Sequence, residues 1–256
     1  MPLGEGPAVV EGARVLAIAN QKGGVAKTTT SITLASALAE RGKRVLVLDL
    51  DAQACASFSL GIDPEDVPRD ATPFLGDSAR IIGTAEGVDL LPATSDLARA
   101  DHALAAKSGR ERLVRDFVAL HRGKYDWVIL DCSPSLGIMT INALVAADDV
   151  LIPVHCETLS HRGVGQVMEA VAEVRRWANP DLRVVGILPT LYDGRSLHAR
   201  AIRDDLAERY DVPVLAPIPR SVRVAEAPAT GRTILATAPG SPAARAYRDL
   251  ASVLLA

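Results

Sequence analysis

The stretch Lys-Gly-Gly-Val-Ala-Lys-Thr, residues 22 to 28, lies between the apolar run Val15 to Ala19 and a helical pattern that runs from Thr28 to Glu40. A glycine-rich turn between a strand and a helix points backbone N–H groups at phosphate oxygens. In such a loop Lys27 reaches the β- and γ-phosphates, and the Thr28 hydroxyl binds Mg²⁺. A solvated lysine in a glycine-rich turn is the alternative, and the agreement between loop chemistry and position favours a nucleotide site.

The loop departs from the common pattern G-x-x-x-x-G-K-[ST] at two positions. Gln21 stands at the position of the first Gly and is followed by Lys22, and Ala26 replaces the Gly directly before Lys27. The Ala26 methyl group needs space beside the phosphates and a φ that an L-residue tolerates. This position is therefore where the nucleotide site is expected to differ from the common loop.

The composition is that of an ordinary globular protein. Of 256 residues 48% are apolar and 23% charged, and this length suits one α/β domain. No apolar run is long enough to span a bilayer, and the first residues lack a charged region followed by a hydrophobic stretch. Cys55, Cys132 and Cys156 lack metal-ligand spacing, which predicts buried small side chains in a cytoplasmic protein.

Apolar runs of strand length alternate with helical patterns along the chain. Most of the runs are continuous, as in strands covered on both faces. Such a βαβ series predicts an α/β fold with a doubly wound, mainly parallel sheet flanked by helices, and ligands at the carboxyl ends of the strands. The predicted strands are Val15 to Ala19, Val45 to Leu50, Val88 to Leu91, Trp127 to Leu130, Val150 to Val154, Val184 to Leu188 and Val214 to Ile218. The predicted helices are Thr28 to Glu40, Ser95 to Ala106, Arg110 to His121, Gly163 to Trp177, Leu197 to Tyr210 and Ala243 to Ala256.

No linker rich in Pro, Gly or Ser divides the chain. Residues 61 to 84, which contain Pro64, Pro68 and Pro73, indicate a surface excursion rather than a domain boundary. We therefore expect a flexible N-terminal tail over residues 1–12 and a single P-loop domain over residues 13–256.

Two of the predicted strands end in carboxylates. Asp49 and Asp51 close one of them, and period-two geometry puts both on one face. Asp131 follows the run that ends at Leu130. Acidic side chains at such ends hold the Mg²⁺ hydration shell or orient the water that attacks the γ-phosphate. One such Asp alone is more often a helix cap or a turn residue, whereas three of them with the loop favour metal binding and catalysis.

Charge is distributed unevenly along the chain. The net charge of −3 argues against a globally basic nucleic-acid binder. All lysines lie at or before Lys124, whereas from Arg195 onward there are nine arginines against six acidic residues. This local excess could form an electrostatic footprint for phosphate backbones, and a solvated arginine-rich helix face explains it equally well.

Several motifs, taken in order, resemble the ParA/Soj-type partition ATPases of the ParA/MinD group, whose phosphate loop is a deviant Walker A motif. The resemblance runs from about Ala13 to the end of the chain. The motifs are Lys22 to Thr30, Asp49 to Gln53, Asp131 to Gly137, Thr140 to Leu144, Thr190 to Arg195, Ile218 to Arg223 and Ala225 to Pro228. The resemblance implies an ATP-bound sandwich homodimer on the nucleoid. Such a dimer binds double-stranded DNA without sequence preference and hydrolyses ATP slowly until a ParB-type centromere-binding protein stimulates it.

The resemblance also implies roles for single residues. Lys22 reaches the phosphates bound by the partner subunit, and Asp51 acts on the hydrolytic water. Asp131 holds the Mg²⁺ shell through water, Thr28 binds the metal, and Asp51 is a further metal candidate. The implied catalytic residues are Lys22, Lys27 and Asp51. The implied nucleotide-binding residues are Lys22, Gly23, Gly24, Val25, Ala26, Lys27, Thr28, Thr29 and Pro219, and the DNA-facing residues are Arg195, Arg220 and Arg223.

The chain departs from the family pattern without losing a reactive group. Ala26 replaces Gly, Ala52 replaces the Pro of D-x-D-P-Q, and Ser133 replaces the first Pro of D-x-P-P-S. Residues 157 to 163 replace a stretch that usually reads E-Y-Y-A-L-E-G. We expect the fold and ATP binding to persist with weakened hydrolysis, because Ala26 sits where backbone and phosphate approach most closely.

Two other functions remain open at the level of sequence. The first is a MinD-like positioning ATPase for a membrane or cytosolic cargo. The C-terminal helical pattern has Tyr247, Leu250, Val253 and Leu254 along one side, and it lacks lysines and a basic tail. We therefore expect it to pack against the domain, and no stable membrane association is expected. The second is a nucleotide-gated binding module with weak turnover, which the presence of every reactive group disfavours.

Overall fold

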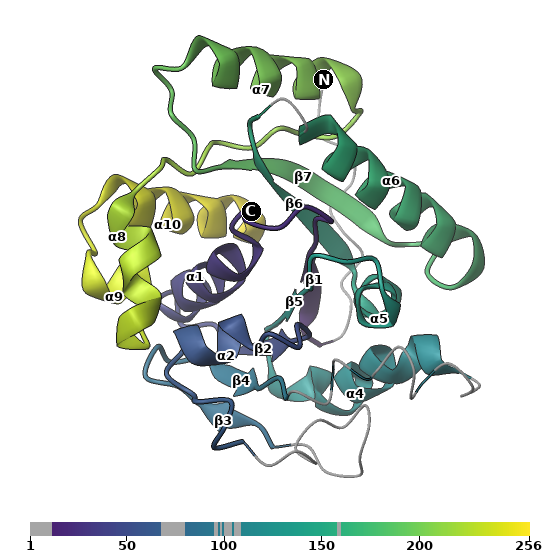
Figure 1. Ribbon diagram of the computed structural model, residues 1–256. Helices are drawn as coiled ribbons and strands as arrows, with labels where there is room; N and C mark the ends of the chain where they lie inside the picture. The colour runs from purple at the N-terminus through teal and green to yellow at the C-terminus, as the bar shows by residue number, and fades with distance from the viewer. Residues whose placement is uncertain are drawn as a thin grey trace.

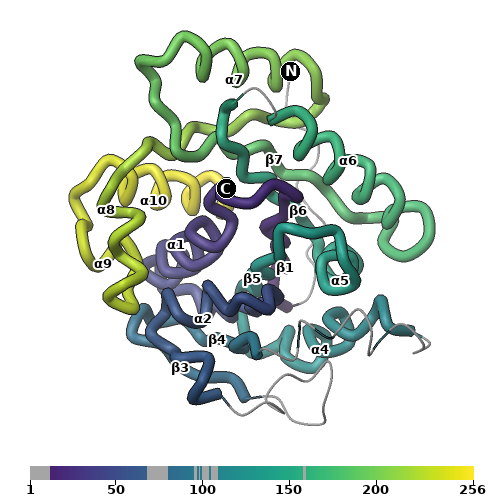
Figure 2. The backbone as a smooth tube through the Cα atoms, viewed as in Figure 1, coloured from purple at the N-terminus to yellow at the C-terminus, as the bar shows by residue number. Residues whose placement is uncertain are grey.

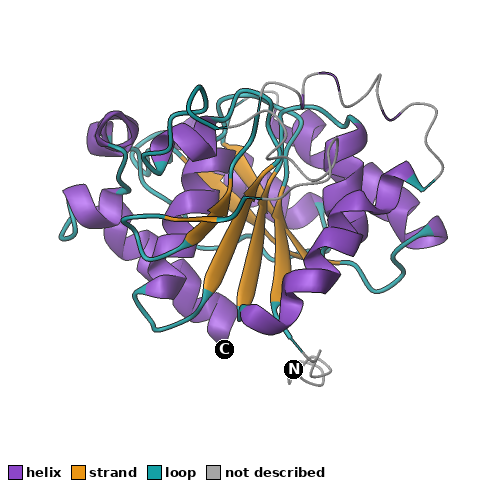
Figure 3. Cartoon of the chain, turned by 90° about the horizontal axis from the view of Figure 1, so that it is seen from below, coloured by secondary structure: helices purple, strands orange, loops and turns teal. Residues whose placement is uncertain are grey.

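The computed structural model describes residues 12–67, 80–94, 97, 99, 104, 109–157 and 160–256. Within these residues a seven-stranded sheet carries helices on both faces (Figures 1 and 3). The strands are β1 (Arg14–Ile18), β2 (Val45–Asp49), β3 (Ile82–Gly83), β4 (Asp89–Leu91), β5 (Trp127–Asp131), β6 (Asp149–His155) and β7 (Arg183–Thr190). Their order is β3-β4-β2-β5-β1-β6-β7, and β3 runs antiparallel to β4 while the other neighbours are parallel. This confirms the predicted doubly wound, mainly parallel sheet.

Parts of the expected organisation lie outside the described residues. They are residues 1–11 of the N-terminal tail, residues 68–79 of the surface excursion and most of the predicted helix Ser95 to Ala106.

The helices form two layers around the sheet. They are α1 (Lys27–Ala39), α2 (Cys55–Ser59), α4 (Leu113–His121), α5 (Ile138–Ala146), α6 (Ser160–Trp177), α7 (Leu197–Arg209), α8 (Val222–Glu226), α9 (Ile234–Thr237) and α10 (Pro242–Leu255). Short 3₁₀ helices are η3 (Arg110–Arg112), η4 (Arg122–Lys124) and η5 (Ala227–Thr230). Along β1, Val15 and Ala17 pack into the core that holds α4, α5 and α6, whereas Leu16 and Ile18 pack into the core that holds α1 and α10. This alternation follows from the opposite directions of successive strand side chains.

The C-terminal helix α10 lies beside α1, although the two are far apart in sequence (Figure 2). Ser241 caps it by accepting a hydrogen bond from the N–H of Ala244, with Pro242 in its first turn. Tyr247 is fully buried, and its hydroxyl lies 3.2 Å from the Thr30 hydroxyl of α1. The predicted packing against the domain is confirmed for Tyr247, Leu250 and Leu254. It is wrong for Val253, which is 59% exposed.

The predicted strand Val214 to Ile218 is not a regular strand. The segment runs beside β7 and pairs with it at an isolated point, Ile187 with Val214, and a second isolated bridge joins Tyr192 and Pro219 beyond the end of β7. Pro213, Pro217 and Pro219 lack the N–H that a continuous ladder needs, so the pairing is interrupted. The segment still covers the outer side of β7, because the N–H of Ile187 donates to the Pro213 carbonyl at 2.8 Å.

The carboxyl ends of the central strands meet at one edge of the sheet. Asp131 at the end of β5 pairs in register with Ile18 of β1 and with Asp49 of β2. The chain leaves β1 at this edge and enters α1 after the glycine-rich loop. The fold therefore brings the loop and both predicted carboxylate ends together. No helix within the described ranges is long and apolar enough to cross a bilayer.

Candidate nucleotide site

The glycine-rich loop is held in place by contacts from both sides. The Lys27 side chain is buried, and its Nζ donates to the Lys22 carbonyl at 3.0 Å. The buried Thr190 of β7 donates its hydroxyl to the Val25 carbonyl at 3.0 Å. Gly23 and Gly24 are exposed at the tip. The loop is therefore preformed, with the Lys27 amino group inside it.

Ala26 adopts a left-handed backbone conformation, the kind of unusual φ that the sequence raised as a question at this position. Its φ is 61° and its ψ is 35°, directly before the first residue of α1. For an L-residue this conformation costs about 1–2 kcal/mol, because Cβ approaches the following carbonyl oxygen. Ala54, which precedes α2, has φ 52° and ψ 32°. Two alanines near the sheet edge are therefore held in a backbone region that favours glycine.

Asp131 combines deep burial with an unused oxygen. Its Oδ1 accepts a 2.7 Å hydrogen bond from the Ser31 hydroxyl of α1. Its Oδ2 is buried, and the described part of the chain offers it no hydrogen-bond partner. Burial, followed by the neighbouring Asp49, raises the pKa of Asp131 to about 7, while the hydroxyls of Ser31 and Thr28 act in the opposite direction. A hard divalent cation prefers oxygen ligands of this kind, so the site fits Mg²⁺ held through Asp131 and Thr28.

Lys27 adds a cation close to this carboxylate. Burial lowers the pKa of Lys27, and the charges of Asp131, Cys132 and Asp51 oppose this shift. A buried ammonium needs oxygen acceptors for its N–H groups, and phosphate oxygens would add to the one that the Lys22 carbonyl supplies. The chemistry of the loop is therefore that of phosphate binding.

Asp49, the last residue of β2, and Asp51, which follows the strand, have different surroundings. Asp49 is buried, and its Oδ2 accepts from the N–H of Ser57 at 2.8 Å and from the Ser57 hydroxyl at 2.7 Å. Burial raises the pKa of Asp49 to about 6. Asp49 therefore anchors α2 and does not face the cavity described next.

Asp51 faces a cavity of about 270 Å³ at the carboxyl edge. Ser133, Pro134 and Gly137, which follow β5, line the same cavity. The Asp51 Oδ1 accepts a hydrogen bond from the N–H of Gln53 at 3.0 Å, which fixes the turn after β2. Of these two carboxylates, only Asp51 is among the residues that line this cavity.

Lys22 is directed away from the interior of the loop. Its Nζ lies 2.9 Å from Oε2 of Glu157, which follows β6, and both side chains are partly exposed. The Lys22 N–H donates to Asn20 Oδ1 at 2.9 Å, and Asn20 Nδ2 donates to the Pro153 carbonyl at 2.7 Å. Sequence reasoning missed Asn20, Glu157, Ser31 and Thr190. Only Asn20 and Ser31 lie close enough in sequence to the loop to have given a local signal.

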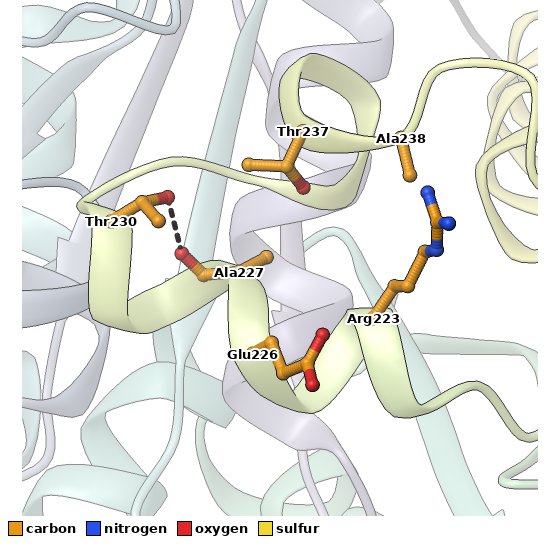
Figure 4. Close-up of a pocket in the computed structure, with 6 residues that line it drawn as sticks. All are labelled: Arg223, Glu226, Ala227, Thr230, Thr237 and Ala238. Atoms are coloured by element: carbon orange, nitrogen blue, oxygen red, sulfur yellow. Dashed lines mark hydrogen bonds between the residues drawn. The ribbon is translucent and has the colours of Figure 1, made fainter.

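Pro219 and the three predicted arginines lie on the segments that follow β7. Pro219 pairs with Tyr192 beyond the end of β7. Arg195 is 93% exposed and pairs with Asp193, and Arg220 is exposed and also near Asp193. Arg223 extends from α8 toward Ala238 at the end of α9, across a cavity of about 210 Å³ (Figure 4). The structure therefore places the arginines at the surface, apart from the loop residues.

Comparison with known proteins identifies relatives that match nearly the whole chain. A family described as an AAA domain matches residues 13–184. The chromosome-partitioning ATPase Soj of Thermus thermophilus is 45% identical over 95% of this chain and 96% of its own length. The sporulation initiation inhibitor protein Soj of Bacillus subtilis is 40% identical over 95% and 98%.

A solved structure with nucleotide and metal is also similar. It is named cobyrinic acid a,c-diamide synthase from Mycobacterium smegmatis, with bound ATP analogue and magnesium. It is 48% identical, covers 95% of this chain and 94% of its own, and superposes with a TM-score of 0.85. The phosphate loop and the Asp131 site are those expected of an ATPase, and these relatives indicate the same activity. The chain belongs to the ParA/Soj family of partition ATPases, within the ParA/MinD group, and is an ATPase that uses ATP and Mg²⁺.

Proposed function

We propose that the protein partitions DNA by an ATP-controlled homodimer. Two subunits close on two bound ATP molecules, and Lys22 of each subunit reaches the phosphates held by the other. The observation that carries this proposal is the orientation of Lys22. Lys27 already occupies the loop interior, whereas the Lys22 amino group points out of the loop on a partly exposed side chain.

Within each subunit the loop residues have separate tasks in this proposal. Gly23, Gly24, Val25, Ala26 and Thr29 surround the phosphates with backbone groups, Lys27 neutralises the β- and γ-phosphates, and Pro219 borders the base. Thr28 and Asp131 hold Mg²⁺, which neutralises charge on the transferring phosphoryl group. Asp51 orients the attacking water from the cavity that it lines after β2.

The same dimer presents a DNA surface. Arg195, Arg220 and Arg223 contact phosphates of double-stranded DNA without reading its sequence, and closing the dimer doubles the number of contacts. A ParB-type centromere-binding protein stimulates the slow hydrolysis and releases the dimer. The protein acts in the cytoplasm, on the nucleoid.

The test is the oligomeric state with and without nucleotide. We expect a monomer with ADP and a dimer with Mg²⁺ and a slowly hydrolysed ATP analogue, measured by light scattering during size-exclusion chromatography. Lys22→Gln should remain a monomer with the analogue while still binding ADP, because Lys27 is intact. A Lys22→Gln protein that dimerises as well as the unchanged protein contradicts the proposal.

Two further experiments test the two other functions, a positioning ATPase for a membrane cargo and a binding module with weak turnover. Sedimentation with anionic liposomes tests a membrane cargo, and the burial of Tyr247, Leu250 and Leu254 against the domain favours no binding. Release of phosphate from ATP tests the binding-module alternative. We expect slow release that rises on addition of DNA and the ParB-type protein encoded by the same genome, and no release at all would favour a binding module.

A further inference from the structure

The ion pair between Lys22 and Glu157 has a specific architecture. The Lys22 backbone is fixed at both its N–H and its carbonyl, by Asn20 and by Lys27. Glu157 is fixed as well, because its N–H donates to the Ser160 hydroxyl at 2.8 Å and its carbonyl accepts from the N–H of Ser160 at 2.9 Å. The two backbones are therefore anchored, and the contact between Nζ and Oε2 depends on the two side chains alone.

The charges around Glu157 favour this contact. Lys22 first, and then His155, lower the pKa of the Glu157 carboxyl. His155 Nδ1 lies 3.2 Å from Oε1, the oxygen that does not face Lys22. Glu157 is thus an ionised acceptor at neutral pH, with one oxygen directed to the lysine.

If the Lys22 amino group moves across a dimer interface to phosphate oxygens of the other subunit, it leaves Glu157 and the ion pair is lost. We propose that Glu157 is an intramolecular latch that holds Lys22 in the isolated subunit and opposes ATP-dependent dimerisation. The inference rests on the proposed role of Lys22 in the dimer. It adds a residue of the connection between β6 and α6 to the control of that step.

The partial exposure of the Lys22 and Glu157 side chains limits how far their ion pair can shift the dimerisation equilibrium. An ion pair between partly exposed side chains shifts an equilibrium by up to about fivefold. Two latches open when a symmetric dimer forms, so their effects multiply to about 25-fold at most. The latch therefore adjusts the protein concentration at which the dimer forms and does not prevent it.

The test compares dimer dissociation constants by analytical ultracentrifugation with Mg²⁺ and a slowly hydrolysed ATP analogue. Glu157→Gln and Glu157→Ala should lower the dissociation constant by about three- to 25-fold, with ADP affinity of the monomer unchanged. Glu173→Gln on the exposed face of α6 is the matched control, and it should leave the constant unchanged. Circular dichroism confirms that each variant is folded.

The possible outcomes distinguish failure of the latch hypothesis from failure of the proposed dimer. If the unchanged protein dimerises, Lys22→Gln does not, and both Glu157 variants keep the original dissociation constant, the latch is wrong and the role of Lys22 stands. If Lys22→Gln dimerises normally, the proposed function fails before the latch is tested. Tighter dimerisation in Glu173→Gln to the same extent as in Glu157→Gln would also overturn the latch, because the effect would then be one of net charge.

Discussion

At the scale of single residues, the site contains two alanines in a conformation that favours glycine. Ala26 precedes α1 and Ala54 precedes α2, with φ values of 61° and 52°. The sequence predicted that Ala26 would need an unusual φ, because it replaces a loop glycine. It gave no such expectation for Ala54, whose conformation depends on how Asp49 holds the start of α2. The strain is local, so substitution by glycine at each position isolates its effect.

Ala26→Gly should stabilise the protein and increase its ATPase rate. Relief of the left-handed strain outweighs the extra backbone entropy of glycine, for a net gain of about 0.5–1 kcal/mol in the free energy of unfolding. Urea denaturation measures the gain, and steady-state phosphate release measures the rate. Ala54→Gly is the control, with a similar gain in stability and a smaller change in rate. An unchanged hydrolysis rate in Ala26→Gly would sink the idea that this methyl group weakens turnover.

Asp131→Asn should separate stability from magnesium binding. The substitution removes a buried negative charge whose Oδ2 has no partner among the described residues, so the nucleotide-free protein should unfold at the same or a higher temperature. Mg²⁺ with an ATP analogue should raise the melting temperature of the unchanged protein and leave that of the variant nearly unchanged. Asp116→Asn, an exposed position on α4, should behave like the unchanged protein. Equal stabilisation of both by Mg²⁺ and nucleotide would exclude Asp131 from the metal site.

At the scale of elements, the sequence predicted most of the strands and helices that have a clear hydrophobic pattern. The central strands were identifiable because they are continuous apolar runs, and the loop was identifiable because its chemistry is local. The segment Val214 to Ile218 was predicted as a strand, although its prolines interrupt the pairing. The short helices α2, α8 and α9 were missed because four or five residues carry too little periodicity. The nine-residue helix α5 was also missed, because seven of its residues are buried and it lacks an amphipathic pattern. Glu157 and Thr190 reach the loop only through the order of β6 and β7 in the sheet, which no local pattern contains.

Glu86 joins the turn between β3 and β4 to residues 232 and 233, just before α9. We call this contact the clasp, and it predicts a stability that depends on pH. Glu86, in the turn between β3 and β4, accepts hydrogen bonds from Arg232 at 2.5 Å and from Thr233 at 2.6 Å. Burial raises the pKa of Glu86, but the bonds from Thr233 and Arg232 lower it more, so the net pKa lies below its ordinary value. A lowered pKa in the folded state means that the carboxylate contributes stability above about pH 4.5 and that this contribution is lost as the pH falls further.

Glu86→Gln should therefore lower the free energy of unfolding by about 1–2 kcal/mol at pH 7. The difference from the unchanged protein should shrink as the pH falls below about 4.5, because the wild-type carboxyl is protonated progressively on the way down. Urea denaturation at several pH values measures both effects. Glu208→Gln, an exposed position on α7, serves as the control, and a Glu86→Gln penalty that is independent of pH would contradict the clasp.

At the scale of the whole molecule, the fold separates the nucleotide site from the proposed DNA surface. The loop lies at the carboxyl edge of the central strands, whereas Arg195 and Arg220 lie on the segments that follow β7 and Arg223 lies on α8. Asp193 is placed between two of these arginines, so the surface is less positive than the count of arginines suggests. We therefore expect the proposed DNA surface to bind weakly in a monomer and to gain affinity when two copies join.

The salt dependence of DNA binding tests that surface. With Mg²⁺ and an ATP analogue, the logarithm of the binding constant should fall linearly with the logarithm of salt concentration. Each of Arg195→Ala, Arg220→Ala and Arg223→Ala removes two contacts from a dimer, which should reduce the slope by about 1.8. Asp193→Asn should strengthen binding, because it frees Arg195 from its ion pair. Arg176→Ala, an exposed position in the last turn of α6, should leave the slope unchanged, as measured by fluorescence anisotropy on a duplex of arbitrary sequence. If the three arginine variants keep the original slope, the DNA surface lies elsewhere on the molecule, whereas an effect confined to Arg223→Ala would restrict it to the cavity between α8 and α9.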